Sequence, residues 1–227
     1  MHNHILNILP SPLVPFQPDW IFWVLLGLFF LIAWVQVAYP QRLRLILRAS
    51  FSNRDLHQIE RDGNLSNERI TFVLTVIYLF SVSMITYQFI QLLFPHTSSI
   101  PAFRLYLLLT LAITAFWAFK LFLMNLIAYI FQTEQTNKTY QLNILITTSF
   151  LGLLLIPVLV ITIYLKSVWA LYIGLAFIGS FSLFRLIKGF FIGITLTRFS
   201  YFFLFVYLCT LEILPLLIAA KLIVDYL

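Results

Sequence analysis

Long apolar stretches dominate this sequence, and their length restricts the fold more than any other feature does. An α-helix needs about 20 apolar residues to cross the hydrocarbon core of a bilayer. Charged residues make up 10% of the chain, whereas soluble domains hold about 25%. Six stretches reach the required length, at residues 20–39, 70–94, 103–131, 142–165, 168–187 and 199–224. We therefore predict an all-α, polytopic membrane bundle of six transmembrane helices, without a soluble domain.

The segment before the first span differs from the rest of the chain. Residues 1–19 hold four prolines, which exclude a regular helix, interleaved with apolar side chains. We expect this tail to lie extended on the membrane surface or on a neighbouring protein. Residues 20–227 then form the transmembrane domain.

The one sizeable polar region, residues 40–69, is predicted to be an amphipathic cytoplasmic loop. Its first part has the pattern of an interfacial helix, because Leu43, Ile46 and Leu47 share one helical face. The arginines of this part lie elsewhere on the helix; they are Arg42, Arg44 and Arg48. A second short helix is predicted over residues 53–62. We interpret the basic residues as contacts to lipid head groups that also set the topology, with a docking surface for a cytoplasmic partner as the alternative.

The distribution of basic residues predicts the orientation of the chain. Three basic residues fall on the side opposite the 40–69 loop: Arg104, Lys166 and Lys221. Ten fall on the side of the loop: Arg42, Arg44, Arg48, Arg54, Arg61, Arg69, Lys138, Arg185, Lys188 and Arg198. By the positive-inside rule, the loop faces the cytoplasm and both termini face away from it. Because these charges sit at the ends of apolar segments and not on a soluble module, we predict no binding of nucleic acid.

Two ionisable residues lie near the middle of predicted spans, Lys120 in the third and Glu212 in the sixth. A charge at such a depth costs about 2.5 to 3.5 kcal/mol or more, so a contact between the two is the economical arrangement. We predict a Lys120–Glu212 pair that fixes the register of two helices, with a proton-relay or ion-coupling role as the alternative. Pro215 should kink the sixth helix beside Glu212, and Pro157 should bend the fourth.

The stretch after the fifth span has two interpretations. Residues 184–197 are apolar but include Arg185 and Lys188, which we expect to make basic contacts on the cytoplasmic side. Gly189 and Gly193 have the GxxxG spacing that lets helices approach closely in lipid. The stretch is either a packed helix or a short re-entrant or surface-lying segment.

Sequence signatures of chemistry are sparse. The chain has no HExxH, GxSxG or Walker motif, and His2 and His4 of the tail are too few ligands for a metal site. We therefore predict no catalytic residues, no metal and no cofactor, and we favour a non-enzymatic role. Polar residues within the spans, such as Asn125, Thr148 and Ser149, are expected to hydrogen-bond across helices.

Three stretches carry a resemblance to a known family. They are YLCTLEILPLLIAAKL at residues 207–222, LFRLIKG at residues 183–189 and FSNRDLHQIERDGNLSNER at residues 51–69. In these stretches the chain resembles family four-two-seven-one of the domain-of-unknown-function series, integral membrane proteins of Bacteroidetes-type bacteria. The resemblance covers most of the chain after the tail. It implies a location in the bacterial inner membrane and supplies no activity.

Two functions from different classes fit these features. The first is a non-enzymatic inner-membrane subunit or scaffold of a larger assembly, whose partners are membrane lipids and other integral membrane proteins. Short loops, an apolar proline-rich tail and an aromatic content of 18% favour it. The alternative is a small proton- or ion-coupled transporter that uses the Lys120–Glu212 pair, and a membrane enzyme is a third possibility.

Overall fold

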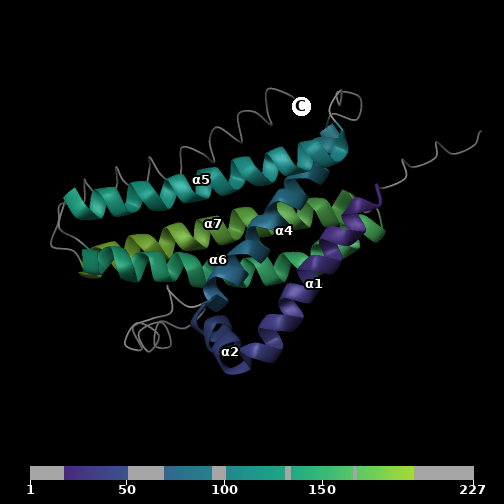
Figure 1. The fold of residues 1–227 in the computed structure, drawn as a ribbon. Coiled ribbons are helices and arrows are strands. Elements are labelled where there is room, and N and C mark those ends of the chain that lie inside the picture. The colour runs from purple at the N-terminus through teal and green to yellow at the C-terminus, as the bar shows by residue number, and fades with distance from the viewer. Residues whose placement is uncertain (1–17, 51–68, 94–100, 131–133, 166–167, 197–227) are drawn as a thin grey trace, which may run out of the picture.

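The fold of the described residues is entirely helical (Figure 1). The computed structural model describes residues 18–50, 69–93, 101–130, 134–165 and 168–196. Its helices are α1 (Trp20–Ala38), α2 (Pro40–Ala49), α4 (Arg69–Leu93), α5 (Ala102–Ile130), α6 (Glu134–Tyr164) and α7 (Val168–Leu196). All of these except α2 are long and apolar enough to cross a membrane. The chain is thus an apolar helical bundle with several candidate spans, as predicted.

The predicted bounds differ from the observed ones mainly around the last two described spans. The first three predicted spans match α1, α4 and α5 to within a residue or so at each end. The fourth predicted span corresponds to α6, which begins at Glu134, eight residues earlier than predicted. The fifth corresponds to α7, which continues to Leu196 instead of ending at residue 187. Residues 184–196 are therefore a continuation of the α7 helix. The predicted sixth span and the predicted helix at 53–62 lie outside the described residues.

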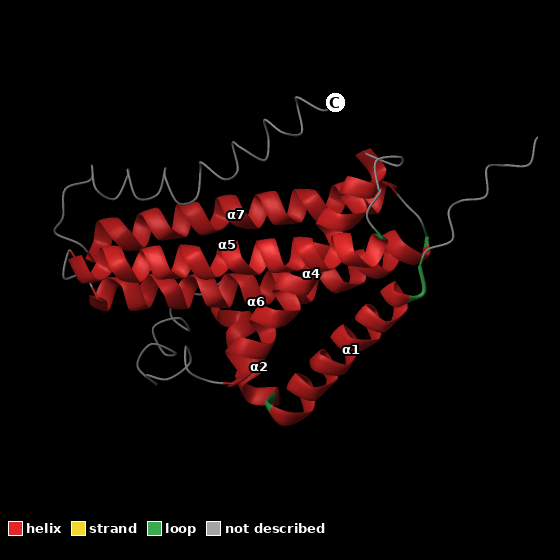
Figure 2. Ribbon diagram, turned by 45° about the horizontal axis from the view of Figure 1, so that its top comes forward, coloured by secondary structure: helices red, strands yellow, loops and turns green. Residues whose placement is uncertain are grey.

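Pro40, the first residue of α2, marks the break between α1 and α2. The residue before a proline is pushed out of the α-helical region, and Tyr39 has φ −137° and ψ 51°. Pro40 then starts α2 at a position where its missing amide hydrogen costs nothing. As a result the chain turns sharply at the end of the first span, and α2 lies at that end of the bundle (Figure 2).

The two central helices of the bundle are α4 and α6. Figure 1 shows α5, α6 and α7 running in similar directions while α4 crosses them, and Figure 2 shows α1 diverging from the bundle toward α2. In the apolar window of each span, 67% of residues are buried in α4 and 61% in α6, against 22% in α1, 17% in α7 and 11% in α5. Most residues in the apolar windows of the three outer helices are therefore not buried within the bundle.

A glycine allows the central helices to touch backbone to backbone. A Cβ atom added to Gly152 of α6 would lie 2.9 Å from the Cα atom of Tyr78 in α4. In lipid there is little hydrophobic force between helices, so such close approach is a main source of their attraction. The absence of a side chain at Gly152 therefore allows α4 and α6 to approach closely at this point.

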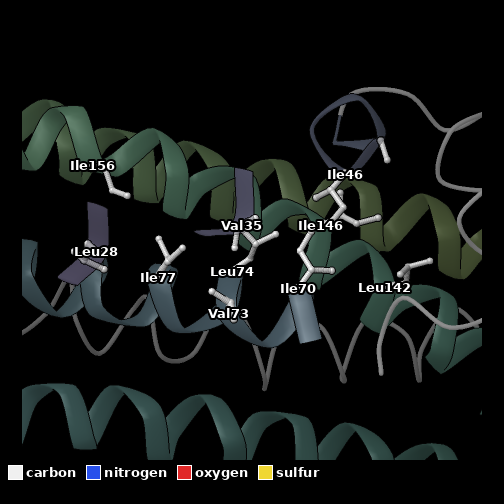
Figure 3. Packing of buried hydrophobic residues seen from close by; sticks show 11 residues of the cluster. Leu28, Val35, Ile46, Ile70, Val73, Leu74, Ile77, Leu142, Ile146 and Ile156 are labelled. Carbon is white, nitrogen blue, oxygen red and sulfur yellow. The ribbon is translucent and has the colours of Figure 1, made fainter. Parts of the chain in front are cut away.

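The apolar face of α2 is buried by protein. Ile46 of α2 is 1% exposed and belongs to a cluster with Val35, Ile70 and Ile146, which come from α1, α4 and α6 (Figure 3). The predicted interfacial helix is thus present, but its central apolar residue packs on the bundle and not on the lipid.

The opposite end of the bundle is closed by aromatic rings. Trp20 of α1 lies 5.4 Å from Tyr87 of α4 and 5.6 Å and 5.0 Å from Phe103 and Tyr106 of α5, measured between ring centroids. Aromatic residues concentrate where a span meets the membrane surface. This cluster joins α1, α4 and α5.

Replacement of Gly152 by alanine should destabilise the bundle. The added methyl group meets the backbone of α4, which cannot move aside as a side chain would, and overpacking of this kind costs about 1 to 3 kcal/mol. Gly27→Ala and Gly179→Ala are matched controls, because nothing lies within 4 Å of a Cβ atom at either position. Unfolding in mixed detergent micelles should show a lower free energy of unfolding for Gly152→Ala and an unchanged one for the controls. Equal stability of all three variants would contradict the close contact.

Candidate functional site

Lys120 is buried although its neighbours on α5 are not. Its side chain is 8% exposed, whereas Phe119 and Phe122 are 57% and 61% exposed. Lys120 also takes part in a polar, ring or electrostatic interaction. The ammonium group therefore turns into the protein, as an intramembrane charge requires.

Buried polar groups of α6 lie at a similar depth. Met124, one turn along α5 from Lys120, belongs to one apolar cluster with Tyr140 and Ile144 of α6. Because the two helices run in opposite directions, this cluster places Lys120 about level with Thr147. The amide nitrogen of Asn143 and the hydroxyl of Thr147 are buried and have no hydrogen-bond partner among the described residues.

The predicted partner of Lys120 lies outside the described residues. Glu212 and Pro215 both belong to that part of the chain, so the charge pair and the kink beside it stay predictions. Pro157 lies inside α6, and its ring is exposed. The bend predicted there also stays a prediction.

Lys188 joins α7 to the end of α2. Its Nζ atom donates a hydrogen bond to the backbone oxygen of Ser50 at 2.7 Å and lies 4.9 Å from the centroid of the Phe184 ring. Ser50 ends α2, and its hydroxyl lies 3.4 Å from the backbone oxygen of Ile146 in α6. A cation at the carboxyl end of a helix also interacts favourably with the helix dipole. We call Ser50, Phe184 and Lys188 the α2–α7 junction.

Burial affects the protonation of Lys188, which lies beyond the apolar part of α7. Removal from water lowers the pKa of its ammonium group below the usual 10.5. The folded chain therefore holds this proton less tightly than the unfolded chain does. The contribution of Lys188 to stability is smallest below its folded pKa and increases as the pH rises toward 10.5.

The other predicted basic contacts fall into two groups. Arg185, one turn before Lys188, is partly buried, and its charge acts on the hydroxyl of Tyr78 in α4. Arg44 and Arg48 are exposed on α2. Arg42 is half-buried and takes part in an interaction. The sequence predicts that these residues lie on one side of the membrane but does not reveal that Arg185 and Lys188 point into the bundle.

Hydrogen bonding within the spans follows two patterns. As predicted, Asn125 bonds across helices: its Oδ1 atom accepts from Asn137 at 3.1 Å and from Gln141 at 2.6 Å, both on α6. The hydroxyls of Thr148 and Ser149 instead donate to carbonyl groups of their own helix, one turn back. The prediction of cross-helix bonds was therefore wrong for these two residues, because a backbone carbonyl of the preceding turn is always within reach.

The described residues contain no cluster of three or more His, Cys, Asp or Glu side chains that could hold a metal ion. The positions of Lys120 and Lys188 instead suit two different roles. Lys120 places a group that can carry a proton in the membrane interior, and the α2–α7 junction fixes a basic helix at one end of the bundle.

Replacement of Lys188 by methionine should loosen α2. A hydrogen bond from a charged donor contributes about 1.5 to 3 kcal/mol, so amide hydrogen exchange in residues 40–50 should accelerate roughly tenfold or more. Lys138→Met is a matched control, because Lys138 is exposed in α6 at the same end of the bundle. As a second readout, the wild-type chain should gain stability relative to Lys188→Met between pH 7 and about pH 10, as the sign of the pKa shift requires. If amide hydrogen exchange in residues 40–50 is equal in Lys188→Met and Lys138→Met, the α2–α7 junction does not hold α2 in place.

The comparisons with known proteins concern the chain as a whole. No curated protein and no solved structure matches it. The chain does match the family described as Domain of unknown function (DUF4271), over residues 21–223. This match runs from the second residue of α1 to one residue before the end of the predicted sixth span, and it agrees with the resemblance inferred from the three sequence stretches. The chain therefore belongs to the DUF4271 family.

Proposed function

We propose that the protein is a non-enzymatic subunit or scaffold of a larger assembly of integral membrane proteins. The observation that carries this proposal is the exposure of three spans. Few residues in the apolar windows of α1, α5 and α7 are buried, and the exposed side chains include large aromatic ones such as Phe30, Phe119 and Trp169. Aromatic side chains supply large contact areas at protein interfaces.

The location is part of the proposal. We place the protein in the bacterial inner membrane, with the loop at residues 40–69 in the cytoplasm and both termini on the periplasmic side. The excess of basic residues on the loop side supports this orientation. The exposure of Arg44 and Arg48 on α2, next to the end of the first span, is compatible with it.

A photocrosslinking amino acid can test the subunit role in intact cells. Placed at Phe30, Phe119 or Trp169, which are 69%, 57% and 80% exposed, it should capture another membrane protein from at least one position. Leu155 is the matched control, because it is 0% exposed and should give no adduct. The captured protein should also co-purify with the tagged chain in a gentle detergent at a fixed ratio. If no adduct forms at any of the three exposed positions and the chain purifies as a monomer or dimer, the protein is not a subunit of this kind.

A small proton- or ion-coupled transporter is the second candidate, and the burial of Lys120 favours it. Intramembrane charges in transporters mark the paths of ions and protons. In this proposal Lys120 and Glu212 pair near the middle of the membrane. Buried polar groups of α6, Asn143 and Thr147, would extend the polar environment toward one end of the bundle.

A double-mutant cycle separates the two candidates. Lys120→Met or Glu212→Gln alone should destabilise the chain by about 3 to 5 kcal/mol, because each leaves the other charge buried without a counter-charge. The double variant should regain much of that stability. If the stable double variant still assembles and supports growth, the pair is structural and the transporter role is wrong. Strictly additive single effects would show that the two residues do not meet.

A further inference from the structure

Helix α2 has two faces of different chemistry, and protein contacts fix which of them points outward. Ile46, Ala49 and Ser50 are each 1% exposed and face the bundle. The hydrogen bonds of Ser50 and Lys188 hold the end of the helix in place. Because its inner face is occupied in this way, α2 cannot roll to bury that face in lipid.

The outward face of α2 carries two arginines. Arg44 and Arg48 are exposed and four residues apart, so their side chains emerge next to each other on one side of the helix. Arg69, the first residue of α4, is also exposed, and the adjacent Ile70 lies in the same cluster as Ile46. The α2 end of the bundle thus presents several guanidinium groups to the surroundings.

The position of α2 indicates what these groups meet. The helix follows the first span after a single residue, Tyr39, so it lies at the level where the chain leaves the apolar core. Lipid head groups occupy this level. The planar guanidinium group pairs with phosphate oxygens through two hydrogen bonds, which an ammonium group cannot do in the same geometry.

We propose that Arg44 and Arg48 form a binding site for the phosphate groups of anionic phospholipids. Helix α2 itself, PQRLRLILRA at residues 40–49, carries three arginines and no acidic residue. The charge of the exposed face therefore matches an anionic surface. The site depends neither on the subunit role nor on the transporter role of the chain.

Lipid titration of the purified full-length protein tests the site. Native mass spectrometry should show that phosphatidylglycerol binds the wild-type chain more tightly than phosphatidylcholine does. A basic residue near an anionic membrane contributes about fivefold in affinity, so Arg44→Gln/Arg48→Gln should weaken phosphatidylglycerol binding about 25-fold. Phosphatidylcholine binding should not change. The double variant Arg44→Lys/Arg48→Lys should lose less phosphatidylglycerol affinity, because it keeps both positive charges and lacks only the paired hydrogen-bond donors of the guanidinium group.

Arg104→Gln is the matched control, because Arg104 is exposed at the start of α5, at the other end of the bundle. It should leave phosphatidylglycerol binding unchanged, and all variants should unfold at the wild-type temperature in phosphatidylcholine. If Arg104→Gln loses as much phosphatidylglycerol affinity, the effect reflects general surface charge and the proposed site is wrong. An unchanged affinity in Arg44→Gln/Arg48→Gln would also overturn it.

Discussion

The close approach of α4 and α6 at Gly152 is the contact on which the rest of the described bundle depends. In a membrane the attraction between helices comes from packing, which requires that their surfaces fit closely. With no side chain at Gly152, the backbone of α4 can lie directly against α6. The remaining helices attach around this pair: α7 packs along α6, and α5 and α1 contact α4. The central pair is therefore mostly buried, while the outer helices stay largely exposed.

The two ends of the bundle are closed by different physical means. At one end the rings of Trp20, Tyr87 and Tyr106 join three helices through contacts that need no charge. At the other end the joint between α2 and α7 is polar: an ammonium group meets the carbonyl end of a helix. The contact of Lys188 depends on the protonation of its amine, whereas the ring contacts do not.

The spans could be predicted from the sequence because their length and apolar character are local properties, and Pro40 likewise marks the break between α1 and α2. The contacts between helices could not be predicted in the same way. An amphipathic pattern in α2 does not say whether lipid or protein covers Ile46. Gly152, which makes the observed backbone contact, has no glycine four residues before or after it and so lies outside any GxxxG spacing. A single small residue carries no signal until its partner helix is known.

The burial of Lys120 raises the question of which carboxylate neutralises it, and the positions of the acidic residues in the sequence restrict the answer. Hydroxyl and amide oxygens of α6 can solvate an ammonium group but cannot neutralise it, and an uncompensated charge inside the membrane costs several kcal/mol. Asp19 precedes the first span, and Glu134 begins α6 ahead of its apolar part. The other acidic residues outside the predicted spans are Asp55, Glu60, Asp62, Glu68 and Asp225. Glu212 alone falls inside a predicted span, so electroneutrality within this chain favours it as the counter-charge. If a second protein supplied the carboxylate instead, Lys120 would itself be part of the interface of the proposed assembly.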